Sequence, residues 1–343
     1  MKHSANCKYA KRMALVTAIL LFGMGMFFSQ AEAFKCGDTL ARGHYKLTED
    51  LTCFSTDPGD SALILEGGAN LDLNGNTVDC NNDDKREGIV LEGRNAKVRN
   101  GTITNCYNGV VITGDGHHKV SQLIVENSNR EGIIVVSDYN QLINTESMNN
   151  GRRGFYIGID DDDDQVIADD NNLVNCLAKD NGRHGFLIDG GIDNKIISSA
   201  AFDNGNQGFL IDGGNNNKIK NSAAFDSCRD GIEIKKGNDN SLINNYVADN
   251  GNPDTCGDFS YPYLPWFYAG IDITDGAEEN IVINNRTSGN LGCDKVDCVD
   301  VPERNLLDEN VDGEGYCDST NRWINNRVDG ERAEPECVVA FVP

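Results

Sequence analysis

Apolar residues occur along most of the chain in short alternating runs, and each run follows a glycine. Examples are GIVL at residues 88–91 and GFLI at residues 185–188. An apolar period of two is typical of β-strands that bury one face, and no run carries the apolar stripe of an amphipathic helix. The pattern predicts a short strand after each of these glycines: Gly88, Gly109, Gly132, Gly154, Gly185, Gly208, Gly231 and Gly270.

The glycines define a repeat, because the steps between them are 21, 23, 22, 31, 23, 23 and 39 residues. Residues 185–203 and 208–226 are identical at fifteen of nineteen positions. Repeats of this length are supersecondary units that bury a core only by stacking on their neighbours. The spacing therefore predicts a solenoid with an insertion in each of the two long steps.

A polar column supports this register, because a small polar residue follows each glycine after 12 to 14 places, or later where residues 160–168 are inserted. We expect it at a sharp bend, where side-chain amides bond along the stack and satisfy backbone groups that the turn leaves unpaired. The step from Ala62 to Asn74 adds an earlier coil. The other members are Asn100, Ser121, Asn144, Asn175, Ser198, Asn221, Asn244 and Asn284.

Each repeat has room for three short strands, which predicts an all-β fold, a right-handed parallel β-helix of about eleven coils and roughly 50 Å in length. Alternation should turn Ile89 and Leu91 inward. Inside, successive coils should stack three aromatic rings, those of Phe155, Phe186 and Phe209. The expected organisation is a cap at 34–61, the β-helix at 62–330 with an insertion at 251–269, and a tail at 331–343.

The repeat of glycine, alternating apolar residues and an Asn-bearing turn resembles the right-handed β-helix repeat of the pectate-lyase-like superfamily, from about Ala62 to Asn326. The resemblance implies a groove along the first strand of each coil, with a polysaccharide lying across several coils. Members of the superfamily cleave or epimerise acidic polysaccharides, hydrolyse glycans or do no chemistry. Residues 232–245 are loosely similar to the Lys-bearing coil of the alginate and chondroitin lyase family, but the next coil, GIDITDG, lacks that family's Arg.

Residues 1–33 have the layout of a secretory signal peptide, with Lys and Arg before an apolar run at 13–28 and a small-x-small site that ends at Ala33. Cleavage after Ala33 predicts a secreted or periplasmic protein. No later apolar stretch reaches the ~20 residues that a membrane span needs. The net charge of −24 argues against nucleic acid as a partner.

Eleven cysteines follow the leader, and in an exported chain they are expected to form disulfides. Cys36 and Cys53 bracket a short segment ahead of the first coil, so we expect them to pair. Four further cysteines crowd the C-terminus and should staple that end: Cys293, Cys298, Cys317 and Cys337. Because eleven is odd, one thiol is either unpaired or bridged to another chain.

The most promising active site lies where Gly231 and Gly270 begin adjacent coils. Outward apolar residues give way there to Glu233 and Asp272, whose backbones should be ~4.8 Å apart. Two such carboxylates can share a proton, and a raised pKa in one of them is what general acid catalysis needs. Asp212 and Lys235 are expected in the same group of side chains. Arg229 lies two residues before Gly231, at the start of the coil that contains Glu233.

The 39-residue step places an aromatic insertion, residues 252–269, directly between these two coils. Its rings could stack on the faces of pyranose sugars, or pack over the apolar strip described next. The rings belong to Tyr261, Tyr263, Trp266 and Tyr268.

Two further columns should lie beside the first strand. Arginines recur two places before the glycine, where they either grip substrate carboxylates or sulfates, or form salt bridges with neighbours such as Glu131. An outward apolar strip is expected under a covering segment, at a self-association interface, or beneath sugar rings, with Tyr156 as a substrate contact. The arginines are Arg86, Arg130, Arg152, Arg183 and Arg229, and the strip is Val90, Val111, Ile134, Tyr156, Leu187 and Leu210.

An acidic run in the 31-residue step offers carboxylates to Ca²⁺ through Asp160, Asp162 and Asp164, although a solvated acidic loop explains it equally simply. No other cofactor is required. His117, His118 and His184 are expected to be surface or turn residues. Three functions stay open: an extracellular enzyme that acts as a lyase, hydrolase or epimerase on an acidic polysaccharide, a non-catalytic β-helix that binds glycan or protein, and a structural module of an assembly.

Overall fold

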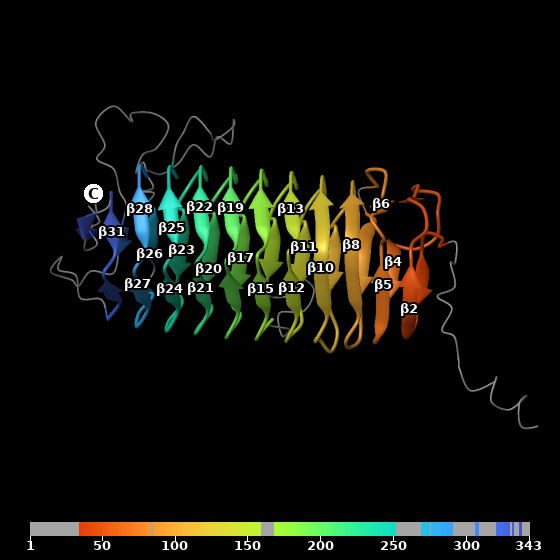
Figure 1. Ribbon diagram of the computed structural model, residues 1–343, viewed down its shortest axis with the longest axis horizontal. Helices are drawn as coiled ribbons and strands as arrows, with labels where there is room; N and C mark the ends of the chain where they lie inside the picture. Colours follow the sequence, from red (N-terminus) through yellow and green to blue (C-terminus); the bar gives the residue numbers. More distant parts are fainter. Residues whose placement is uncertain are drawn as a thin grey trace, which may run out of the picture.

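The computed structural model describes residues 34–83, 85–158, 168–251, 269–274, 276–290, 306–308, 320–329, 331–332 and 336–337. Over these residues the chain is a right-handed parallel β-helix, as predicted, and the described part contains strands but no helix. Figure 1 shows the coils stacked in one row, from the N-terminal strands in red and orange to the C-terminal strands in blue.

The first strand of each coil belongs to one parallel sheet of twelve strands, here called sheet A. Most of its strands start directly after a repeat glycine, and register pairs equivalent residues of successive repeats, as in Phe186 with Phe209. Its strands are β1 (Asp38–Leu40), β4 (Ser61–Leu65), β7 (Glu87–Leu91), β9 (Val110–Ile112), β11 (Ile133–Val135), β14 (Phe155–Ile157), β17 (Phe186–Asp189), β20 (Phe209–Asp212), β23 (Ile232–Lys235), β26 (Ile271–Thr274), β29 (Leu306–Asp308) and β33 (Glu336–Cys337).

The second strands of the coils form the second face. It consists of β2 (Gly43–Lys46), β5 (Ala69–Asp72), β8 (Lys97–Thr104), β10 (Lys119–Glu126), β12 (Gln141–Ile143), β15 (Asn172–Val174), β18 (Lys195–Ile197), β21 (Lys218–Lys220), β24 (Ser241–Ile243), β27 (Ile281–Ile283) and β30 (Arg322–Ile324). The long strands β8 and β10 continue through the bend and join this face to the third one.

The third face completes each coil and consists of β3 (Leu51–Thr52), β6 (Thr77–Asp79), β13 (Glu146–Met148), β16 (Leu177–Lys179), β19 (Ala200–Phe202), β22 (Ala223–Phe225), β25 (Tyr246–Ala248), β28 (Arg286–Ser288) and β31 (Arg327–Val328). The short β32 (Glu331–Arg332) pairs antiparallel with β31. About nine regular turns run from β4 to β28, so the predicted eleven coils are reached only when the less regular turn at each end is counted.

The predicted aromatic stack lies in the core. Phe155, Phe186 and Phe209 are fully buried, with ring centroids 4.7 and 4.8 Å apart and nearly parallel planes. The glycine that precedes each strand allows this close stacking. A Cβ on Gly88 would lie 2.2 Å from the carbonyl oxygen of Gly109, so only glycine fits between the coils.

The predicted polar column does form a side-chain ladder, since Nδ2 of Asn175 donates to Oδ1 of Asn144 at 2.8 Å and Nδ2 of Asn244 to Oδ1 of Asn221 at 3.3 Å. The backbone groups of the bend, however, are satisfied one residue later. Asn175, Ser198 and Asn221 are exposed or half-exposed and hold the left-handed conformation of the bend, with φ between 52° and 55°. The residue after each of them is buried and forms the ladder. The backbone N–H of Ser222 donates to Oδ1 of Asn245 at 2.9 Å, and that of Asn245 donates to Oδ1 of Asn285 at 2.8 Å.

A second buried ladder runs along the bend between sheet A and the second face. In each rung a backbone N–H donates to the Oδ1 of the next asparagine at 2.8 to 2.9 Å, from Asn140 through Asn171, Asn194, Asn217 and Asn240 to Asn280. These amides satisfy the backbone groups that the bend removes from the sheets. The sequence therefore predicted the side-chain ladder at the first bend, but the amides that satisfy backbone groups are those of its buried neighbours and of this second bend.

The Cys36–Cys53 disulfide is confirmed, and Cys80 and Cys106 form a second one near the same end. Cys228 is also disulfide-bonded. Cys176 is free and buried, and burial raises the pKa of its thiol to about 12, so it cannot bridge to another chain without unfolding. The signal peptide and the C-terminal Cys293, Cys298 and Cys317 lie outside the described residues. Within the described residues, no helix is long and apolar enough to cross a membrane.

Replacing Asn217 by Leu should remove two hydrogen bonds. Its Oδ1 accepts from the N–H of Asn194, and its Nδ2 donates to the carbonyl of Gly191, both at 2.8 Å. Each buried group left unpaired costs about 1–3 kcal/mol. Asn221→Gly at the neighbouring bend serves as the control and should change the free energy of unfolding by less than about 0.5 kcal/mol. Equal denaturation midpoints for the two variants would contradict the ladder assignment.

Removing the N-terminal disulfide by Cys36→Ser and Cys53→Ser should lower the free energy of unfolding by about 2–4 kcal/mol, because the bridge restricts the unfolded chain. Both sulfur atoms lie at the end of the core, so the loss should appear first as fraying of β1–β4. Amide hydrogen exchange can locate this fraying. Uniform loss of protection along all coils would show instead that the bridge stabilises the β-helix as one unit.

Candidate functional site

Glu233 and Asp272 lie side by side on the outward side of sheet A. They are register partners on β23 and β26, and Leu210 occupies the same position on the preceding strand β20. Both carboxylates are nearly buried, with 8% and 3% of the residue surface exposed. The outward apolar column therefore ends in two adjacent acids, in the place that the repeat predicts.

The carboxylate of Glu233 is held from both neighbouring strands. Nε2 of Gln207, at the start of β20, donates to Oε2, and the hydroxyl of Thr274 on β26 donates to Oε1 at 3.1 Å. Burial raises the pKa of Glu233 above its ordinary value, and the negative charge of Asp212 adds to this, although the two hydrogen bonds act in the opposite direction. Glu233 is thus a positioned acid that holds its proton more tightly than a free carboxyl.

Asp230 is a third buried acid, which the sequence analysis missed. It is 3% exposed, and its Oδ1 accepts the backbone N–H of Ala269. Burial and the neighbouring charge of Glu233 raise the pKa of Asp230 well above its ordinary value. Two acids of one coil therefore compete for ionisation, which favours at least one proton on the pair.

The position of Asp230 directly before Gly231 could have identified it from the sequence. Residues in this place form a column of their own, because each repeat glycine donates its N–H to the carbonyl of the residue before the next glycine, as Gly208 does to Asp230 at 3.1 Å. The column reads Glu87, Asn108, Glu131, Arg153, His184, Gln207 and Asp230. It borders the outward strip and supplies it with polar groups.

His184 belongs to this column and is more than a turn residue. Burial and the positive charges of Arg153, Arg229 and Arg183 lower the pKa of its imidazole to about 3, so the ring is neutral at ordinary pH. Its Nδ1 atom is buried and makes no hydrogen bond among the described residues. The ring is thus a neutral hydrogen-bonding group among three guanidinium groups, and it also interacts with the side chain of Gln207.

The opposite edge of the strands is more open. Nζ of Lys235 lies 3.5 Å from Oδ2 of Asp212, and about a third of each side chain is exposed. Asp189 occupies the same register position one strand earlier, and the hydroxyl of Tyr156 donates to its Oδ2 at 3.2 Å. A ligand approaching sheet A would therefore meet this edge before it met Glu233.

The predicted column of arginines is present, but its members make different contacts. Arg86 is buried and donates to the carbonyls of Phe54, Asp57 and Gly59, so it fixes the N-terminal cap and belongs to no open rim. Arg152 forms the expected salt bridge with Glu131 at 3.4 Å.

Two members of the column lie near the acids instead. Arg183 is exposed and Arg229 half-buried, and their charges act on His184 beside the acidic cluster.

The outward apolar strip is packed rather than open. Tyr156, Leu187 and Leu210 form a cluster and are 5%, 4% and 7% exposed, with Ile134 against them. The guanidinium of Arg153 lies 4.5 Å from the centre of the Tyr156 ring. Tyr156 can therefore offer a sugar its polar edge but little of its ring face.

Several predicted site residues lie outside the described part of the chain: the aromatic residues Tyr261, Tyr263, Trp266 and Tyr268, and the acidic residues Asp160, Asp162 and Asp164. Among the residues that are described, no group of three or more His, Cys, Asp or Glu side chains is arranged to hold a metal ion.

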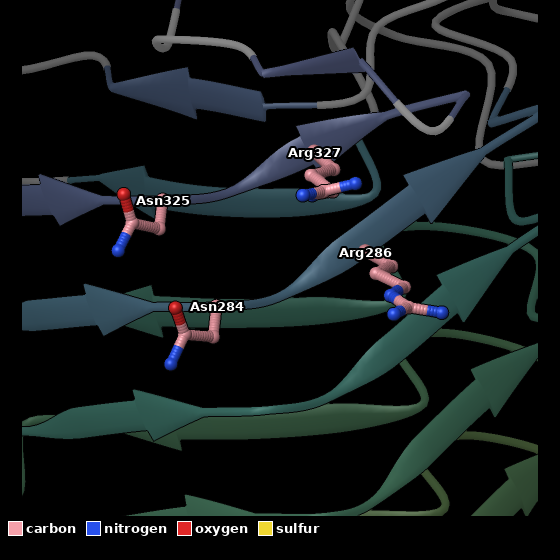
Figure 2. A pocket seen from close by; sticks show the side chains of 4 residues that line it. All are labelled: Asn284, Arg286, Asn325 and Arg327. Carbon is pink, nitrogen blue, oxygen red and sulfur yellow. The ribbon is translucent and has the colours of Figure 1, made fainter.

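Three hollows in the described part of the chain lie away from sheet A, and two of them matter below. One, of 490 Å³, is lined by Asn284, Arg286, Asn325 and Arg327. Figure 2 shows the two arginines on successive strands, β28 and β31, and the two asparagines at the bends that precede them. The other, of 740 Å³, lies at the N-terminal end of the second face.

The acidic cluster should make stability depend on pH. The pKa values of Asp230 and Glu233 are raised from 3.8 and 4.5, so the folded chain binds more protons than the unfolded one above those values. Their contribution is present at low pH and is lost as the pH rises through the raised pKa values. Denaturant titrations should show that Asp230→Asn with Glu233→Gln flattens this decline. The exposed control Asp115→Asn should leave it unchanged, and an equal slope in both variants would contradict the assignment.

Known proteins share this fold. The family described as the right handed beta helix region matches residues 159–297 and, in an overlapping match, residues 190–328. No curated protein matches the chain by sequence.

Three solved structures illustrate the likeness. The Dettilon tailspike protein gp208 is 14% identical with a TM-score of 0.57, and the match covers 85% of this chain but only 60% of the tailspike. The A-module of the Azotobacter vinelandii mannuronan C-5 epimerase AlgE6 is 12% identical with a TM-score of 0.55, with 88% of both chains covered. A double mutant of the periplasmic alginate epimerase AlgG is 10% identical with a TM-score of 0.57, covering 88% of this chain and 71% of AlgG.

At these identities the likeness concerns the fold, and it agrees with the parallel register of all twelve strands of sheet A. The chain is a right-handed parallel β-helix protein, similar to tailspikes and alginate epimerases in fold and not assigned to a specific enzyme family.

Proposed function

We propose that this protein binds an extracellular acidic polysaccharide across β20, β23 and β26 of sheet A, and that Glu233 donates a proton during its cleavage or epimerisation. The observation that carries the proposal is the buried Glu233 carboxyl, which has a raised pKa and is gripped by Gln207 and Thr274. A positioned acid with a raised pKa is what general acid catalysis requires.

The other groups have roles that follow from their charge. Asp272, one rung above Glu233, is the partner carboxylate that accepts a proton or stabilises positive charge. Lys235, paired with Asp212 at the open edge, and Arg183 and Arg229 on the opposite side offer cations to the carboxylates of the sugar chain. A strongly acidic protein needs such local cations to hold a polyanion.

The fold relatives support the choice of ligand. Two of them are named as a mannuronan C-5 epimerase and an alginate epimerase, the latter periplasmic. The disulfides suit secretion or the periplasm, as the leader suggests. The aromatic side chains Tyr261, Tyr263, Trp266 and Tyr268 as sugar contacts, and Ca²⁺ at Asp160, Asp162 and Asp164, stay part of the proposal.

A second candidate is binding without chemistry. It is favoured by the small exposure of the two carboxylates, 8% for Glu233 and 3% for Asp272, which limits contact with a bulky polymer. In that case the more exposed Lys235 and Arg183 hold the glycan, and the acids serve only to shape the strands.

The test uses wild type, Glu233→Gln, Asp272→Asn and the control Glu146→Gln on the third face, with a panel of polyuronates and neutral glycans. Cleavage is followed by reducing ends, and epimerisation by deuterium uptake from solvent. We expect turnover of a polyuronate, a loss of about 10²–10⁴-fold in Glu233→Gln, and little change in the control.

Binding is measured in parallel by calorimetry. Binding without turnover in wild type, retained in Glu233→Gln, would select the second candidate. Neither binding nor turnover of any acidic glycan would refute both, and full activity of folded Glu233→Gln and Asp272→Asn would place the site elsewhere.

A further inference from the structure

The 740 Å³ pocket at the N-terminal end of the second face concentrates positive charge. Four basic side chains line it, those of Arg42, His44, Arg94 and Lys97, together with Asn70, Asn95 and glycine backbone. Its lining contains no acidic residue. A basic hollow is unexpected in a chain with a net charge of −24, where most of the surface repels anions.

Three successive coils build the pocket. His44, Asn70 and Lys97 are register partners on β2, β5 and β8, so their backbones are one rung apart. Arg42 precedes β2, and Arg94 precedes β8. Two rungs separate the outer members, which places the two arginine backbones about 10 Å apart. This distance suits a ligand with two anionic groups better than a single small ion.

Among the described residues, no salt bridge reaches Arg42, Arg94 or Lys97. Arg94 contacts a neutral acceptor instead, since its Nη2 lies 2.9 Å from Nε2 of His117. Neighbouring positive charges without a salt-bridge partner repel one another. A bound anion would reduce this repulsion.

One glycine keeps the pocket floor open. Gly68 has a φ of +81°, which other residues rarely adopt. A Cβ at this position would lie 3.0 Å from Cγ of Arg42 and would displace the arginine side chain. The bend is therefore shaped so that Arg42 can lie across it.

An aromatic platform adjoins the pocket on the same bend. The rings of His117 and Tyr139 are stacked, with centroids 4.9 Å apart and planes 11° from parallel. Both residues have a left-handed backbone, with φ of +58° and +59°, where most bends of this protein have Asn, Asp or Gly. Tyr139 is also 52% exposed. A bulky exposed ring in a disfavoured conformation points to a role other than stability.

We propose that the pocket and platform form a second glycan-binding site, which holds the carboxylates of an acidic oligosaccharide at Arg42, Arg94 and Lys97 and packs a sugar face on Tyr139. The choice of an acidic sugar rests on the function proposed above. The negative charges of Asp138, Asp169 and Asp170 act on Tyr139, and its hydroxyl donates a hydrogen bond to Asp170, so the anionic groups of the ligand are directed away from these acids and toward the arginines. The strong negative net charge disfavours nucleic acid as the occupant.

The test measures binding of a galacturonate tetrasaccharide to the full chain by calorimetry, with a neutral glucan tetrasaccharide, sodium sulfate and a single-stranded DNA oligonucleotide as comparisons. Arg42→Gln with Arg94→Gln should weaken tetrasaccharide binding at least tenfold. The matched control, Arg286→Gln with Arg327→Gln in the pocket of Figure 2, removes the same charge and should change it less than twofold. Arginine-selective labelling read by mass spectrometry should show protection of Arg42 and Arg94 by the ligand.

Tyr139→Asn separates a binding role from a structural one. Asparagine accepts the left-handed conformation better than tyrosine, so this variant should melt at a higher temperature while it binds the tetrasaccharide several-fold more weakly. Three results would overturn the proposal. The first is unchanged affinity in the double arginine variant and in Tyr139→Asn. The others are an equal loss of affinity in the control, and equally strong binding of DNA, sulfate or the neutral glucan. Binding here should persist in Glu233→Gln. Turnover of a polyuronate without binding at the pocket would refute the second site and leave the proposed function of sheet A intact. Binding at the pocket without turnover would support the second site and refute the enzymatic function of sheet A.

Discussion

The stacking of one coil on the next, in strict register, is the constraint on which this structure depends. In the regular coils, a strand residue has an equivalent one rung above and below, so each such position becomes a column of similar side chains. Apolar columns close the core, as the rings of Phe155, Phe186 and Phe209 do. Polar columns must be self-complementary, and asparagine suits this because it both donates and accepts. The buried ladder from Asn140 to Asn280 follows from that requirement.

The same constraint creates the unusual electrostatics of the molecule. Like charges in one column repel, and a partner of opposite charge offsets this for Arg152, which lies beside Glu131. Asp230 and Glu233 lie on one coil at sheet A, out of water and close to each other, and both therefore have raised pKa values. Their raised pKa values follow chiefly from burial between strands.

The two proposed sites use the coil repeat in different ways. On sheet A the column of residues before the repeat glycine changes from Arg153 through His184 and Gln207 to Asp230, so polarity varies rung by rung along a potential binding track. At the N-terminal bend the cations of Arg42, Arg94 and Lys97 lie around one hollow and are followed by the ring of Tyr139. The second arrangement concentrates positive charge locally in a chain that is negative overall.

The sequence by itself determined the fold, the aromatic stack, the Cys36–Cys53 bridge and the adjacency of Glu233 and Asp272, because glycine spacing sets the register and register sets which residues meet. It assigned the hydrogen bonds to backbone groups one residue too early, because Asn244 and Asn245 are chemically alike and only the bend decides which is buried. Asp230, His184 and the basic pocket also required the tertiary structure. Their properties depend on burial and on neighbours from other coils, which no local pattern records.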